Sequence, residues 1–131
     1  MEFALVAPLL LLLTAGALDY ALLLRSAASL ADAARVGAQF GSLNTGNSSN
    51  LSGMQTAAVN SIPGISGVTA TAVQSCQCPG GTAVSCTGSC TGGKMLIYVK
   101  VTTQATIDTV FGYSQLPFTA TVKGQASMRA Q

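Results

Sequence analysis

The apolar residues are not spread evenly along this chain. Between Phe3 and Leu24, Asp19 is the single charged residue. As a helix rising ~1.5 Å per residue, this stretch would span ~33 Å, about the thickness of a bilayer core. After it the composition changes to Ala, Ser, Asp and Arg, and a narrower apolar stripe continues to Phe40. The pattern predicts one N-terminal helix over residues 1–41, apolar at its start and amphipathic at its end.

The remaining residues, 42–131, are expected to form a small head. Polar turn-forming residues predict a loop from Asn44 to Asn50, and the spacing of apolar residues predicts a short helix from Leu51 to Ser61, capped by Asn50. Two N-x-S sequons begin at Asn47 and Asn50; chance occurrence is our main interpretation, and glycosylation is the alternative.

From Val68 onward the apolar residues alternate with polar ones, as in half-buried strands. Strands are predicted over 68–76, 94–107 and 118–130, with the second, KMLIYVKVTTQATI, at the centre. In the third, Ala120, Val122, Ala126 and Met128 should face inward, together with Phe118. About three antiparallel strands with the long helix over their apolar face predict an α+β fold.

Four cysteines, Cys76, Cys78, Cys86 and Cys90, lie in the segment SCQCPGGTAVSCTGSC. An even number in a loop-rich segment behind an apolar helix predicts two disulfides in an oxidising compartment. The alternative is a four-thiolate zinc site, which C-x-C spacing fits poorly. We favour nested pairing, Cys76 with Cys90 and Cys78 with Cys86, although crossed pairing remains possible.

Charged residues make up 8% of the chain, far below the ~25% of ordinary soluble domains. Such a surface suits packing between subunits or a glycosylated exterior. The six cations look scattered and the net charge is +2, so nucleic acid is not an expected partner. No histidine, close carboxylate pair, phosphate-binding loop or nucleophile motif is present in the sequence. We therefore expect no enzyme activity, cofactor or metal.

The charges around the apolar run indicate its processing. Arg25 and Arg35 follow the run, which by the positive-inside rule would place the head in the cytoplasm, where disulfides are rare. A secretory signal would also need a basic start. Both conflicts disappear if a basic leader preceded Met1 and was removed.

Three positions in the helix suggest contacts with other copies. Glu2 and Asp19 are carboxylates in an apolar stretch, where they need a partner or the headgroup layer. Pro8 would either bend the helix slightly or unwind it locally. Asp32 and Arg35 should pair within the helix. The residues expected at a subunit interface are Glu2, Phe3, Leu5, Pro8, Leu9, Leu10, Leu12, Leu13, Asp19, Tyr20, Leu23 and Arg25.

These residues carry a family resemblance. The start MEFALVAPLLLLL, then Asp19-Tyr20 and the stretch SAASLADAARVGAQF, resembles the TadE-like family, pilin-like components of Tad-type (tight adherence) systems. The end LPFTATVKGQASMRA resembles the closing strand of that family, and the cysteine cluster resembles that of some members. The family motif V-E-F-A-L-x-x-P-x-L is matched at Glu2, Phe3, Ala4, Leu5, Pro8 and Leu10.

The resemblance implies a prepilin peptidase that removes a basic leader, and the Tad-type assembly machinery, as partners. In pilin-like proteins the acidic residue lies a few residues further in, where it pairs with the terminal amine of a neighbouring subunit. Here Glu2 is second, which leaves two interpretations: the given sequence lacks a few residues of the mature chain, or its terminus lies in a different register. The resemblance therefore implies burial of Glu2, but not its pairing with a terminal amine.

Our first hypothesis is a structural subunit that leaves the bacterial inner membrane and joins identical subunits in an extracellular, type IV/Tad-like filament that supports surface attachment. The second is a monomeric, membrane-anchored adhesin or envelope binding protein. A third, an electron-carrying filament, is disfavoured because the seven aromatic residues form no continuous ladder in the sequence.

Overall fold

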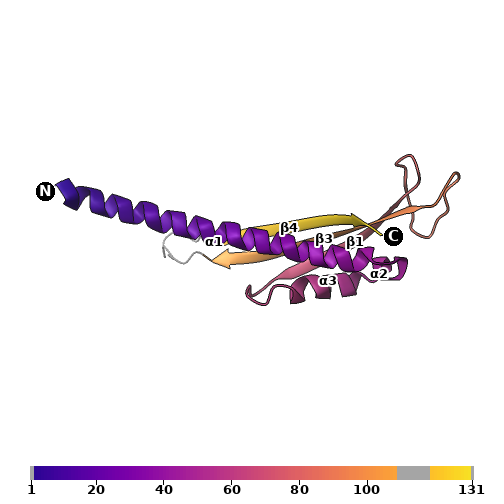
Figure 1. The fold of residues 1–131 in the computed structure, drawn as a ribbon, viewed down its shortest axis with the longest axis horizontal. Helices are drawn as coiled ribbons and strands as arrows, with labels where there is room; N and C mark the ends of the chain where they lie inside the picture. The colour runs from indigo at the N-terminus through magenta and orange to yellow at the C-terminus, as the bar shows by residue number, and fades with distance from the viewer. Residues whose placement is uncertain (1, 109–118, 131) are drawn as a thin grey trace.

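The computed structural model describes residues 2–108 and 119–130, with the side chains of residues 2–5 and 119 left out. Three helices precede an antiparallel sheet (Figure 1). The elements are α1 Glu2–Ser42, α2 Thr45–Ser49, α3 Leu51–Asn60, β1 Thr69–Gln77, β2 Ala83–Val84, β3 Leu96–Asp108 and β4 Thr119–Arg129. This arrangement confirms the predicted α+β fold.

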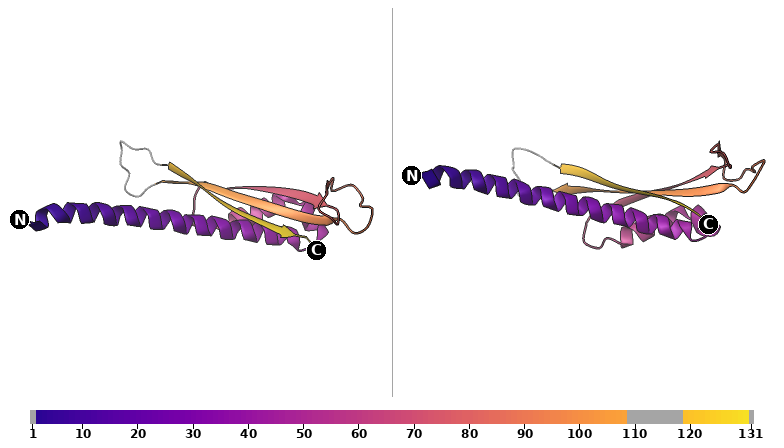
Figure 2. Two further views of the ribbon diagram at one scale, coloured as in Figure 1. Left: turned by 90° about the horizontal axis from the view of Figure 1, so that it is seen from above. Right: turned by 45° about the horizontal axis from the view of Figure 1, so that its top comes forward.

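Helix α1 is the longest element, with 41 residues, and it determines the shape of the molecule. Its N-terminal half extends beyond the sheet, and its C-terminal half lies along the sheet (Figures 1 and 2). Pro8 lies inside the helix, which continues on both sides of it, so the local unwinding that we considered is absent. The predicted single N-terminal helix is confirmed.

The four strands are ordered β2-β1-β3-β4, and each pairs antiparallel with its neighbour. Strand β3 is central, as predicted: it pairs with β1 from Thr69↔Gln104 to Gln77↔Leu96, and with β4 on its other side. The inward and outward residues of β4 also follow the prediction for Ala120–Arg129. Phe118 and residues 109–117, between the second and third predicted strands, lie outside the described residues. The two-residue strand β2 was not predicted.

The core is formed between the sheet and the C-terminal half of α1. Small residues of α1, aliphatic residues of β3 and two residues of α3 are buried together, because the inner face of the sheet alternates with its polar outer face. The central buried residues are Ala34, Ala38, Met54, Ala58, Ala72, Val99 and Val101. Helices α1 and α3 therefore cover the same face of the sheet.

Glycines bring α1 close to its neighbours. A Cβ on Gly37 would lie 2.7 Å from the Met54 carbonyl oxygen, and a Cβ on Gly41 would collide with the Met54 side chain. On the sheet side, a Cβ on Gly124 would collide with the backbone of Leu30 and Ala31. The absence of side chains at these positions is what allows direct helix–helix and helix–sheet packing.

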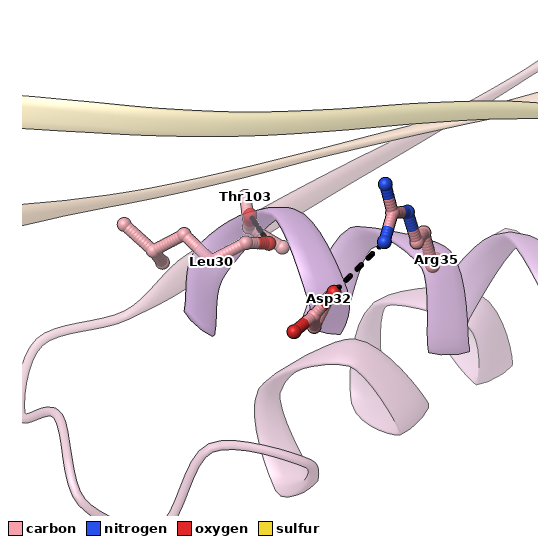
Figure 3. A network of polar contacts seen from close by, with 4 residues as sticks. All are labelled: Leu30, Asp32, Arg35 and Thr103. Carbon is pink, nitrogen blue, oxygen red and sulfur yellow. Dashed lines mark hydrogen bonds and ion pairs between the residues drawn. The ribbon is translucent and has the colours of Figure 1, made fainter. Parts of the chain in front are cut away.

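One buried hydrogen bond joins the sheet to α1. Thr103, fully buried on the inner face of β3, donates its hydroxyl to the Leu30 carbonyl oxygen at 2.7 Å (Figure 3). Thr103 is paired with Gly124 across β3 and β4. Leu30, Ala31, Thr103 and Gly124 together form what we call the helix–sheet contact.

The segment after α1 differs from the prediction. Residues 45–49 form the short helix α2 where a loop was expected, because Asn44 caps it: its side chain accepts a hydrogen bond from the Asn47 backbone amide at 2.7 Å. Asn50 caps α3 as predicted, accepting from the Gly53 amide at 2.9 Å. Gln74 of β1 donates to the buried Ser48 hydroxyl at 3.0 Å, which holds α2 against the sheet.

Candidate assembly surface

The N-terminal part of α1 carries large apolar side chains that the rest of the chain does not cover. Leu9 is 59% exposed, Leu11 70% and Leu13 63%. We call residues 6–24 the apolar rod. Its exposed apolar residues are Val6, Leu9, Leu10, Leu11, Leu12, Leu13, Leu18, Tyr20, Leu22 and Leu24.

The leucines of the apolar rod surround the helix axis instead of forming one stripe. Leu9 to Leu13 are consecutive, and at 3.6 residues per turn five consecutive positions point in all directions. A helix that is apolar all round is stable only in lipid or among other protein segments. Within the described part of the chain, α1 is the one helix long and apolar enough to span a membrane.

The structure places the predicted interface residues in three groups. Pro8, Leu9, Leu10, Leu12, Leu13, Tyr20 and Arg25 are exposed, whereas Asp19 and Leu23 are half-buried. The side chains of Glu2, Phe3 and Leu5 lie outside the described part. The assignment of these residues to a subunit interface remains a prediction.

Asp19 lies where the sheet ends against the helix. A pocket of about 250 Å³ there is formed by Asp19, Tyr20, Leu22 and Leu23 of α1 and by Ile107, Asp108 and Ala120 of the sheet. Asp19 already has an interaction within the chain. Tertiary structure thus places this carboxylate at the base of the head and not in the middle of the apolar rod.

A larger groove begins where the apolar rod ends. It has a volume of about 590 Å³ and lies between the middle of α1 and the segment after α3. Leu22, Ala33, Val36, Ile62, Pro63 and Ile65 form its apolar part, and Arg25 and Asp32 are its charged residues. Asp32 also pairs with Arg35 at 3.0 Å, as predicted (Figure 3). The groove is therefore a continuation of the exposed apolar surface onto the head.

The cysteine-rich loops lie at the opposite end of the molecule from the apolar rod (Figure 1). Both disulfides form, but our nested pairing is wrong: Cys76 pairs with Cys86 and Cys78 pairs with Cys90. The reason is the tight turn after β1, where the Cys78 amide bonds the Thr82 carbonyl at 2.9 Å.

That turn sets which cysteines meet. It pairs Cys76 with Val84 across β1 and β2. Cys86, two residues after Val84, therefore lies close to Cys76 and further from Cys78. Gly80 and Gly81 adopt φ of +108° and +87° in the turn, a conformation that other residues rarely reach. The hairpin register, which the sequence did not reveal, therefore decides the connectivity.

Three aspartates and four cysteines are the potential metal ligands among the described side chains. In the described residues, no group of three or more His, Cys, Asp or Glu side chains is placed to hold a metal ion. All four cysteines are used in disulfides. The exposed apolar rod is therefore the feature of this chain that most needs a functional explanation.

Fold and surface together define the class: a small disulfide-bonded α+β head on a helix whose free end must be covered by lipid or protein. The TadE-like protein family model matches residues 1–39, which is most of α1. This match confirms the family resemblance in the helix, and it includes none of the residues after α1. Comparison with curated proteins and with solved structures gave no match.

Proposed function

We propose that this chain is a structural, pilus-associated subunit that assembles through α1 into an extracellular filament. The single observation that carries the proposal is the apolar rod, which is exposed on all sides at Leu9 to Leu13 and is joined without a break to a folded head. The match of α1 to the TadE-like family supports a Tad-type system.

Burial of the apolar rod is what holds the subunit in a filament once it has left the membrane. Relative to exposure in water, at ~25 cal/mol per Å² of apolar surface, covering a helix of this length contributes tens of kcal/mol before the entropy cost of association. A subunit in the inner membrane already has lipid around its rod. Extraction therefore requires that neighbouring rods replace that lipid. Contacts between different surfaces of identical subunits produce fibres when they do not close into a ring.

The proposal includes the compartment and the partners. Two disulfides suit an oxidising environment outside the cytoplasm. A prepilin peptidase and the Tad-type machinery would process and assemble the subunit, and the head, on the outside of the fibre, would support attachment to surfaces. The competing function is a monomeric membrane-anchored adhesin, which uses the same rod to remain in lipid.

Bulky substitutions in the apolar rod separate these two functions. Leu10→Trp with Leu12→Trp adds volume on opposite sides of the helix. Tryptophan is tolerated in membranes, so insertion should be retained, whereas packing between rods should be lost. We expect normal amounts of the variant in the membrane and at least a tenfold loss of fibres, measured by electron microscopy and N-terminal sequencing of the shed surface fraction.

The control is Leu43→Trp, which lies outside the rod and is 68% exposed, against 59% for Leu12. It should leave fibre yield unchanged. If shed fibres do not contain the polypeptide, or if both variants assemble as well as the unmodified chain, the filament proposal is wrong. Full recovery in the membrane fraction with wild-type cell attachment would then support the anchored adhesin.

A further inference from the structure

The outer face of the sheet, opposite α1 and α3, is the second surface that needs an explanation. Both helices pack on the inner face, so in the described chain no helix or strand covers the outer face (Figure 2). Outward residues of β3 and β4 are mostly threonine, glutamine and serine, with half-buried Tyr98 among them. This surface is mostly polar, apart from the exposed Val73 of β1, which is paired with Lys100, and it lies away from the contacts that assembly would use.

Folding gathers cations on this face. Lys100 of β3 and Lys123 and Arg129 of β4 all point outward and are exposed. Arg129 is paired with Tyr98, and Lys123 is paired with Gln104. In the sequence these cations are widely separated and looked scattered. The sheet register places them in a line that extends over ~20 Å at ~3.3 Å per residue along β3.

The carboxylates are elsewhere. Asp19 and Asp32 are on α1, and Asp108, at the far end of β3, is the one carboxylate among the outward residues of the described strands. The face is therefore positive along the stretch from Tyr98 to Gln104. By charge complementarity, a partner of this face should be anionic.

We propose that this face, defined by Tyr98, Lys100, Lys123 and Arg129, binds an acidic polysaccharide. Arginine and lysine pair with uronate carboxylates, and arginine can do so through two hydrogen bonds. The threonine and glutamine side chains between the cations match sugar hydroxyls. Tyr98 offers an apolar ring face together with a hydroxyl group. A polymer that repeats both carboxylates and hydroxyls fits all of these features.

Other polyanions fit less well. Duplex DNA is usually bound by an element that enters a groove and by six or more phosphate contacts, and an open sheet face with three cations offers neither. An anionic membrane surface would require several large apolar side chains beside the cations, whereas Val73, opposite Lys100, is the one exposed large aliphatic residue on the outer face of the described strands. This binding function goes beyond the proposed assembly role, and it does not depend on it because the two surfaces are on different sides of the molecule.

The test uses the full chain as a monomer in a detergent without sugar groups, so that failure to form filaments cannot affect the result. Sodium alginate oligomers are the probe, and neutral dextran of similar length is the control ligand. Binding is measured by biolayer interferometry at low and at physiological salt. We expect alginate to bind, salt to weaken it, and dextran to bind at least tenfold less well.

A matched pair of variants tests the site itself. Arg129→Gln and Arg35→Gln remove one positive charge each, but Arg35 is on α1 in an exposed ion pair with Asp32. Arg129→Gln should weaken alginate binding about threefold, and Arg35→Gln should have no effect. The triple variant Lys100→Gln, Lys123→Gln, Arg129→Gln should weaken it at least tenfold. Thermal unfolding checks that each variant is folded.

Several results would overturn the proposal. Absent alginate binding would do so, as would equal effects of the two arginine variants, which would indicate attraction by net charge alone. Tighter binding of duplex DNA or of phosphatidylglycerol vesicles than of alginate would assign the face to another partner. If the assembly variants lose fibres but still bind alginate, the binding proposal is supported independently of the filament proposal.

Discussion

At the residue scale, the orientation of the head relative to α1 depends on a few atoms in the helix–sheet contact. Gly124 lies against the backbone of Leu30 and Ala31, and Thr103 donates to the Leu30 carbonyl oxygen at 2.7 Å. Both residues are in the middle of long strands, where side chains normally fill the space between sheet and helix. A small residue and a hydrogen bond therefore substitute here for ordinary side-chain packing.

Gly124→Ala should destabilise the head, because its methyl group would collide with backbone that cannot move without displacing α1. We expect a loss of about 2 kcal/mol in the free energy of unfolding, measured by urea denaturation in detergent. Gly64→Ala is the control, since nothing lies within 4 Å of its new methyl group. Equal stabilities for the two variants would contradict the close contact.

Thr103→Val keeps the shape of the side chain and removes the hydroxyl that Leu30 accepts from. It should cost about 1 kcal/mol of unfolding free energy. Thr103→Ser, which retains the hydroxyl, should keep the hydrogen bond and lose only the contribution of a methyl group. Amide hydrogen exchange of residues 30–34 should increase in the valine variant but not in the serine variant. The reverse order would show that packing matters here and the hydrogen bond does not.

At the element scale, the hairpin of β1 and β2 is held by disulfides instead of by a core. Strand β2 has two residues and few buried side chains, so pairing alone would not hold it. Cys76 is buried under the hairpin, whereas Cys90 is in the loop that precedes β3. The crossed bonds fasten both loops to the end of β1.

Double cysteine variants test the crossed pairing. Cys76→Ser with Cys86→Ser removes one native pair and should leave the other bonded, with no free thiol and a loss of about 3 kcal/mol in stability. Cys76→Ser with Cys90→Ser removes one cysteine from each pair and should leave two free thiols in the monomer, measured by thiol titration after unfolding. A disulfide in the second variant and free thiols in the first would restore the nested pairing.

At the scale of the whole molecule, α1 has two different roles along its length. Its C-terminal half supplies Leu30, Ala34 and Ala38 to the core, and its N-terminal half is the uncovered apolar rod. We predicted a boundary between helix and head at residue 41. That position is at the end of α1, but the rod and the head share this helix. The head cannot form its core without residues 30–38.

Removal of residues 1–18 should separate these roles. The described core begins well after this point, so the shortened chain should fold. Since most exposed leucines are in the deleted segment, it should be monomeric without detergent, measured by size-exclusion chromatography, with the urea midpoint of the full chain. Aggregation with normal far-UV circular dichroism would show that the remaining groove and rod residues suffice for association. Loss of structure would contradict the placement of the core.

Local patterns predicted much of this molecule. The length and composition of residues 3–24 indicated a helix surrounded by lipid or by other subunits, because an apolar helix of this length is not stable in water. Asn50 and the alternation of β3 and β4 indicated a capped helix and a half-buried sheet, because capping and alternation depend on neighbouring residues. The short helix α2 was missed, because a turn-forming composition does not distinguish a capped helical turn from a loop.

The features that remained hidden depend on register. Which cysteines pair is decided by the tight turn that sets Cys76 opposite Val84, and the cationic face exists because pairing of β3 with β4 brings Lys100 and Arg129 to one surface. The need for glycine at position 124 also appears only when α1 is placed against β4. The sequence by itself determined which segments are helix or strand and that the first helix needs an apolar environment. Only the tertiary structure decided which distant residues meet, because that depends on strand register and on how closely backbones approach.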